Sequence, residues 1–338
     1  LISYANSLPN GFVSDDRGVV INANSLSYAF SEPLTSLRPF LNFLAYSIIG
    51  LKPFVFRLIN VIFHIGTVWL LFHLVSLLAG RTVAVIAASL FAVHSILVES
   101  VTWISGGVYV QYGFFFLLSL LLYIQGRPID KRYVASLCAF ILALLSSEKA
   151  VVLPLIFPLY EIAFGDLRKN WKKSVPFFLV SLVYAMLYFG KLGQRAEALT
   201  SASFGGEKTF YNPLIQIPVA ITSYLELMFW PDMLTLYHSE TSYSTIAYIV
   251  LLGIFIALVA GVIFSLKYTR VILFWSLFFV VTLIPTFNPF GLTWIVAERY
   301  VYLGTIGIIV LAALPLSVLL KRKMLKSLGY NVIELKRI

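Results

Sequence analysis

The strongest constraint on this chain is a series of long apolar segments that recurs from about residue 53 to residue 320. A helix needs about 20 apolar residues to cross the hydrocarbon core of a bilayer. Only 12% of the residues are charged, against about 25% in soluble domains. The sequence therefore predicts an all-α polytopic membrane protein, with spans near 53–79, 82–104, 108–126, 132–147, 150–164, 174–191, 243–267, 271–288 and 298–320.

Two apolar stretches do not fit this series. Residues 38–50 are too short to cross a bilayer and are typical of a helix that lies in the interface. Residues 209–231 are long enough, but both of their ends must lie on the same side if the spans after them are to alternate. We expect this second stretch to be re-entrant or interfacial, which agrees with its three prolines.

The charged residues indicate an orientation. The net charge is +10, and Lys and Arg cluster in alternate connections, at 81, 127–132, 168–173, 267–270 and 321–323. By the positive-inside rule these connections are cytoplasmic, and this explanation of the positive charge leaves no reason to expect a nucleic-acid partner. Residues 1–320 are predicted to form one transmembrane domain whose first helix is cut short, and 321–338 a basic cytoplasmic tail.

Asp15 and Asp16 are adjacent acids in a polar loop, residues 7–37, on the non-cytoplasmic side. A charge placed in a bilayer costs at least about 2.5 kcal/mol on insertion scales, so each charge at its edge is a functional candidate. Further ionisable residues are expected to meet the pair on this face. They are Arg38, His94, Glu99, Glu148, Lys149, Glu298 and Arg299.

Each of these residues also has a structural interpretation. Asp15 and Asp16 suit a solvated turn, and Glu99 suits the end of a helix. His94 is more often a core histidine than a catalyst. Glu148 with Lys149, and Glu298 with Arg299, suit local ion pairs. For Asn60 and His64, which lie on one helical face with Arg57, a structural polar stripe is the better interpretation.

Six segments resemble, in sequence order, the transmembrane and tetratricopeptide repeat family of O-mannosyltransferase-like proteins, which belongs to the GT-C glycosyltransferase superfamily. The resemblance covers about residues 5–312. The segments are 10–17 (Asn-Gly-Phe-Val-Ser-Asp-Asp-Arg), 36–39, 53–64, 94–106, 146–154 and 297–303 (Ala-Glu-Arg-Tyr-Val-Tyr-Leu).

The resemblance implies a GT-C-like bundle of about ten transmembrane helices, with interfacial helices on the non-cytoplasmic side. It implies an inverting transfer of a sugar, with mannose as one candidate, from a polyprenyl- or dolichyl-phosphate donor to a protein or glycan acceptor. On this basis Asp15 is the predicted general base, and Asp16 orients it or binds a metal. Mg or Mn is chemically compatible with carboxylates and a phosphate, although no cofactor is required.

The remaining site residues are given roles by the same resemblance. Arg38, Lys149 and Arg299 are the candidates for holding the donor phosphate, because Arg and Lys bind phosphate well. His94, Glu99, Glu148 and Glu298 are expected to support these bases or the sugar hydroxyls. The protein is expected in the plasma membrane of a prokaryote or the endoplasmic reticulum of a eukaryote, with its site on the non-cytoplasmic face.

Several departures from the family pattern keep other functions open. The family often has a charged pair after the position of Gly106, whereas residues 107–110 here are uncharged. No tetratricopeptide repeats are expected in the 18 residues that follow Leu320. The alternatives are a lipid or solute transporter or flippase, and a non-catalytic GT-C scaffold. A transporter is expected to carry its polar groups near the midplane, whereas the charges here gather at one surface.

Overall fold

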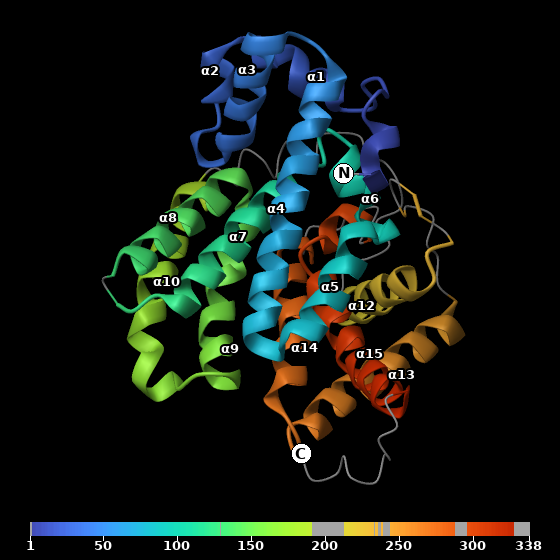
Figure 1. Cartoon of the computed structure of the whole chain (residues 1–338). Coiled ribbons are helices and arrows are strands. Elements are labelled where there is room, and N and C mark those ends of the chain that lie inside the picture. Colours follow the sequence, from blue (N-terminus) through green and yellow to red (C-terminus); the bar gives the residue numbers. More distant parts are fainter. Residues whose placement is uncertain are drawn as a thin grey trace.

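The structure is a computed structural model that describes residues 2–128, 130–190, 213–232, 234–235, 238, 244–287 and 296–327, and every element in them is helical. The all-α prediction is confirmed. Figure 1 shows the short helices α1 (Asp16–Ile21), α2 (Leu26–Ala29) and α3 (Leu37–Ile49) gathered at one end of the long helix α4 (Pro53–Ala79). α5 and α7 make the largest contacts with α4.

Three of the described helices are long and apolar enough to cross a membrane: α4, α7 (Gly107–Gln125) and α13 (Thr245–Ser265). The expected span at 82–104 is not one straight helix, so that prediction was wrong in detail. It consists of α5 (Arg81–Val93), followed by a 3-10 turn and α6 (Val98–Thr102), with a bend of 55° between the two parts. His94 has extended backbone angles at this break.

The other predicted spans correspond to helices that are shorter or less uniformly apolar. They are α8 (Lys131–Ser146), the 3-10 helix η5 (Glu148–Leu155) with α9 (Ile156–Ala163), α10 (Leu167–Phe189), α14 (Arg270–Leu283) and α15 (Thr305–Ser327). The stretch that was expected to be re-entrant or interfacial contains α12 (Pro213–Phe229).

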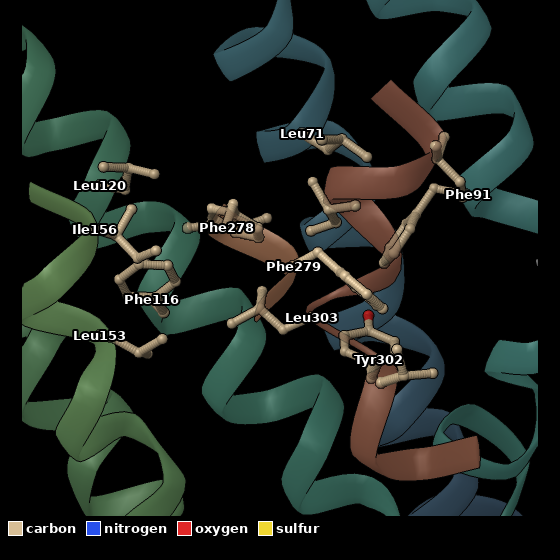
Figure 2. Close-up of a cluster of buried hydrophobic side chains, with 14 of the residues drawn as sticks. Leu71, Phe91, Phe116, Leu120, Leu153, Ile156, Phe278, Phe279, Tyr302 and Leu303 are labelled. Atoms are coloured by element: carbon tan, nitrogen blue, oxygen red, sulfur yellow. The ribbon is translucent and has the colours of Figure 1, made fainter. Parts of the chain in front are cut away.

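The core lies where α7 packs against α4 and α8 and where α15 packs against α5 and α14. Figure 2 shows large side chains from these elements interlocked there, including Phe116 of α7, Ile156 of α9 and Phe278 of α14. All three are fully buried. Helices in a bilayer associate through close packing rather than through exclusion of water, so this interlocking fixes the relative positions of the helices that carry the polar residues.

One face of α4 carries polar side chains through this apolar bundle. Arg57, Asn60 and His64 are all buried, and their spacing places them on one side of the helix. His64 Nδ1 lies 2.9 Å from the hydroxyl of Tyr302. Asn60 and Arg57 lie about one turn and two turns nearer the first loop, respectively, where they reach a break in the helical structure.

Candidate functional site

The candidate site is built around residues 102–105, which run from the last residue of α6 into the short connection to α7. Three successive backbone carbonyls of this segment accept a hydrogen bond from a buried polar side chain. The bonds are Arg57 Nε to Thr102 O (2.9 Å), Asn60 Nδ2 to Trp103 O (3.0 Å) and Arg38 Nη2 to Ile104 O (3.0 Å). Buried carbonyls without partners are costly, so these side chains allow the chain to leave the helix here.

Asp16, in the first loop, also binds the 102–105 segment. We refer to Asp16, Arg38, Arg57 and Asn60 together as the bracket around this segment. Its side chain is fully buried. Oδ1 accepts hydrogen bonds from the backbone N–H (2.9 Å) and the hydroxyl (2.7 Å) of Ser105, and Oδ2 accepts one from the N–H of Val13 (3.1 Å). The carboxylate is therefore occupied by protein donors, and it fixes the first loop against the 102–105 segment.

Arg57 reinforces this attachment. Besides bonding to Thr102, its guanidinium donates hydrogen bonds to the carbonyls of Asn10 and Gly11. The first loop is thus held to α4 and to the end of α6 by a single buried side chain. The sequence indicated only a structural stripe here, and the i, i+3 spacing of Arg57 and Asn60 was the signal of this role.

Asp15 lies in a different environment from its neighbour. It precedes α1, its side chain is exposed, and it forms no cap to the helix. No hydrogen bond reaches its carboxylate from the part of the chain that the structure describes. Ser14, just before it, has a φ of 49°, a conformation in which side chains other than Gly are uncommon. The loop thus turns sharply at Ser14 and leaves Asp15 open to solvent.

A basic cavity of about 330 Å³ lies beside this bracket. Arg38 and Lys149 line it together with Ser105 and Glu148, and Lys149 Nζ lies 3.4 Å from Glu148 Oε1. Arg38 is buried, yet within the described residues its Nε and Nη1 bond to no protein atom. Asn60 Oδ1 and Trp103 Nε1, at the same site, also bond to no protein atom of the described residues.

The buried position of Arg38 also affects its charge. Burial lowers the pKa of the Arg38 guanidinium to about 10, and the nearby Asp16 carboxylate opposes this change. The group therefore stays protonated at neutral pH, but with much of its hydration lost and no matching anion in direct contact. A phosphate in the cavity, which Arg38 lines, would supply the missing negative charge.

A second cavity, of about 430 Å³, lies on the other side of the 102–105 segment. It is lined by first-loop residues, including Ser14, and by Glu99, Trp103 and Glu298. Val19 and Ser105 face the first cavity, whereas Ser14 and Trp103 face the second. The first loop and the 102–105 segment therefore form the wall between the two cavities.

The structure corrects the expected pairing of Glu298 with Arg299. Both the backbone N–H of Arg299 (2.7 Å) and its guanidinium donate to the carboxylate of Glu99, 200 residues earlier in the chain. Glu298 instead accepts from the N–H of Thr235 (2.6 Å) and lies 3.7 Å from His238 Nε2. Adjacent residues were paired in the sequence-based interpretation, because the long-range partner has no local signal.

The side chains of Lys149 and Arg299 both lie against the ring of Tyr300. Lys149 Nζ is 5.7 Å from the ring centre of Tyr300, and Arg299 Cζ is 5.0 Å from it. Arg299 also lies over Trp103 (5.3 Å). Of the three expected phosphate ligands, Arg38 and Lys149 line one cavity. Arg299 does not line that cavity and is paired with Glu99.

His94 does not lie with the other ionisable residues of the candidate site. Its Nδ1 accepts a hydrogen bond from the N–H of Ile96 (3.4 Å), so it caps the 3-10 turn (Ser95–Leu97) at the break between α5 and α6. It lines neither of the two cavities. Its position supports the structural interpretation that the sequence also allowed.

The donor set does not suit a divalent metal ion held by the protein. The two oxygens of Asp16 together already accept three hydrogen bonds from the protein, which leaves this carboxylate little capacity for a metal ion. No group of three or more His, Cys, Asp or Glu side chains with ligand geometry occurs among the described residues.

Comparison with known proteins gives a partial relationship. The chain is 29% identical over 187 residues to protein O-mannosyl-transferase TMTC3 of Homo sapiens, covering 47% of this chain and 20% of that protein. It is 31% identical over 191 residues to protein O-mannosyl-transferase tmtc2 of Xenopus laevis (52% and 22%), and 28% identical over 199 residues to Tmtc1 of Drosophila melanogaster (51% and 23%).

These alignments span about a fifth of the length of each of the relatives. No family model and no solved structure matches the chain. Over about half of its residues, this chain is therefore homologous to the TMTC protein O-mannosyl-transferases.

Proposed function

We propose that this protein is a membrane glycosyltransferase of the GT-C type, with about ten transmembrane helices. It transfers a sugar, mannose by analogy with its relatives, from a polyprenyl- or dolichyl-phosphate to a hydroxyl of a protein or glycan. The relatives named above are protein O-mannosyl-transferases, and the described helices include three long enough to span a membrane. The reaction takes place on the non-cytoplasmic face.

The observation that carries this proposal is the basic cavity beside the first-loop acids. Arg38, which is buried, and Lys149 line the same cavity of about 330 Å³. Such an arrangement suits a phosphate monoester or diester, because Arg offers paired donors and Lys a compact positive charge. Ser105, which lines the cavity, is bonded to Asp16, so the phosphate would lie close to the acid pair.

The proposed reaction breaks the bond between the sugar and the lipid phosphate. The acceptor hydroxyl attacks the anomeric carbon from the opposite face, which inverts its configuration, while its proton passes to the Asp15 carboxylate. The electron pair of the broken bond stays on the lipid phosphate, whose charge is stabilised by Arg38 and Lys149. Asp15 suits the role of base because its carboxylate is open to solvent, whereas the Asp16 carboxylate holds the loop. Asp15 itself lines neither cavity, but it follows Ser14, which lines the second.

Arg299 and Glu99 have a supporting role in this mechanism. Their ion pair joins α6 to the 3-10 helix η7 (Glu298–Val301). Tyr300, which follows Arg299, lies under the ammonium group of Lys149. The pair therefore positions Lys149 through Tyr300 rather than by touching the donor.

Transport without chemistry is less well supported. A transport pathway needs polar groups along a continuous route at mid-depth. Here the acids and the buried arginines gather at one end of α4. Nearer the middle of α4, His64 is bonded to Tyr302, and the core beyond it is mainly aromatic and aliphatic (Figure 2).

The test is transfer by the purified chain in lipid nanodiscs. Radiolabelled mannosyl-phosphoryl-dolichol and a peptide rich in serine and threonine are supplied, and donor binding is measured separately. Label on the peptide that is lost in Asp15→Asn supports the proposal. Binding of donor without transfer, on any acceptor or lipid-linked sugar tried, would identify a non-catalytic scaffold instead.

A further inference from the structure

A second polar cavity lies at the opposite end of α4, far from the acid pair. It measures about 450 Å³ and lies between the α4–α5 turn, the start of α14 and the end of α15. α4 has 27 residues, which at 1.5 Å per residue is about 40 Å, more than the roughly 30 Å of a hydrocarbon core. The two polar ends therefore belong to opposite surfaces of a bilayer.

The lining of this cavity has two chemically distinct parts. Arg81, Lys321 and the hydroxyls of Thr82, Thr269 and Ser317 supply positive charge and polar groups. The remaining wall is mainly aliphatic: Val83, Val271, Ile272, Leu314 and Val318. No acid lines the cavity, and neither Arg81 nor Lys321 is paired with an acid in the described part of the chain.

The position of Arg81 is unfavourable for α5 itself. Arg81 is the first residue of that helix, and Gly80 before it offers no side-chain cap. A positive charge at a helix N-terminus opposes the helix dipole, whereas an anion there is favoured. The placement of this cation is thus costly for the helix unless a negative group lies in the cavity.

We propose that this cavity binds the headgroup of an anionic phospholipid from the leaflet opposite the acid pair. The phosphate lies between Arg81 and Lys321, and an acyl chain follows the aliphatic wall. A free phosphate would use the cations but leave the aliphatic wall uncovered, and a zwitterionic lipid would bring its own cation to the site. Basic pockets between transmembrane helices at the cytoplasmic surface bind anionic headgroups in this way.

The first test measures binding of dioctanoyl phosphatidylglycerol to the full chain in detergent by native mass spectrometry. Dioctanoyl phosphatidylcholine and inorganic phosphate serve as comparison ligands. We expect phosphatidylglycerol to bind, and the double variant Arg81→Gln/Lys321→Gln to weaken it about thirtyfold, since each cation near an anionic headgroup contributes about a factor of five. The matched control is Lys131→Gln/Arg132→Gln, which removes two exposed cations outside the cavity.

Equal weakening by the control pair would show diffuse charge attraction and overturn the proposal, as would equal binding of phosphatidylcholine or of inorganic phosphate. A second variant leaves the cations in place. Val318→Trp fills the aliphatic side of the cavity and is expected to weaken phosphatidylglycerol about tenfold, whereas Leu319→Trp, at an exposed neighbour that does not line the cavity, leaves it unchanged. Unchanged binding in Val318→Trp would exclude this location.

Discussion

The two adjacent acids of the first loop, Asp15 and Asp16, have different environments, and we therefore assign them different roles. Asp15 is exposed, whereas Asp16 is buried and accepts three hydrogen bonds. We expect Asp15→Asn to lower the transfer rate by about 10² to 10⁴, the usual contribution of a general base. Donor affinity and thermal stability should be unchanged, because no described contact is lost. If Asp15→Asn keeps the turnover of the unmodified protein, another residue is the general base.

Asp16→Asn is expected to behave in the opposite way. An amide presents at least one N–H toward donors that are already committed, so a buried hydrogen bond is lost at a cost of about 1–3 kcal/mol. The melting temperature should fall, and proteolysis of the first loop should become faster. Asp15→Asn is the matched control in both measurements. Equal stability of the two variants would contradict the bracket around residues 102–105.

At the scale of elements, the Glu99–Arg299 pair joins α6 to η7. Removing one member of a buried pair leaves the other charge uncompensated, which costs about 3–5 kcal/mol. Arg299→Met and Glu99→Gln should each lower stability, and the double variant should lose less than the sum of the two. A thermodynamic cycle on unfolding midpoints measures this coupling. If the stability lost in the double variant equals the sum of the two single losses, Glu99 and Arg299 do not stabilise each other.

The same pair bears on the expectation that Arg299 binds the donor phosphate. Arg299→Lys keeps the charge but cannot reproduce both the contact with Glu99 and the stacking over Trp103 and Tyr300. We expect reduced stability with a nearly unchanged dissociation constant for the donor. A loss of tenfold or more in donor affinity would instead place Arg299 in contact with the phosphate.

Close approach of α3, α4 and α7 depends on Gly107. A Cβ at this position would lie 2.1 Å from Asn60 Oδ1 and 2.6 Å from the guanidinium of Arg38, far inside contact distance. Gly107→Ala should therefore displace Arg38 and lower donor affinity as well as stability. Gly253→Ala is the helical control, because nothing lies within 4 Å of its Cβ. Normal donor binding by Gly107→Ala would show that Arg38 is not fixed by this contact.

The sequence was sufficient for the helical class and for the segments that meet at the site, because apolar length and clustered charge are local properties. It did not reveal the break at His94, since an extended residue between two helical stretches carries no Pro or Gly signal. It also did not predict which acid pairs with Arg299. Side-chain partners 200 residues apart depend on tertiary packing, which one sequence without relatives does not specify.

At the scale of the whole molecule, the two polar ends of α4 are predicted to face opposite sides of the membrane. The first loop and the basic cavity lie at its start, and the cavity lined by Arg81 and Lys321 lies at its end. This follows from the length of α4 and from the positive-inside rule. The test begins with Cys138→Ser, because Cys138 is the single cysteine and is exposed. Single cysteines are then introduced at exposed Asn24 and at exposed Lys131.

Sealed vesicles of known orientation are treated with a maleimide that cannot cross the membrane. We expect labelling of Asn24→Cys only from the non-cytoplasmic side and of Lys131→Cys only from the cytoplasmic side, because α7 separates the site from the connection before α8. Permeabilised vesicles, in which both positions react, control for accessibility. Labelling of both cysteines from one side would mean that α4 and α7 do not both cross the bilayer. If α4 is the helix that does not cross, the proposed donor site and the proposed phospholipid site lie on the same surface, and both assignments of leaflet are wrong.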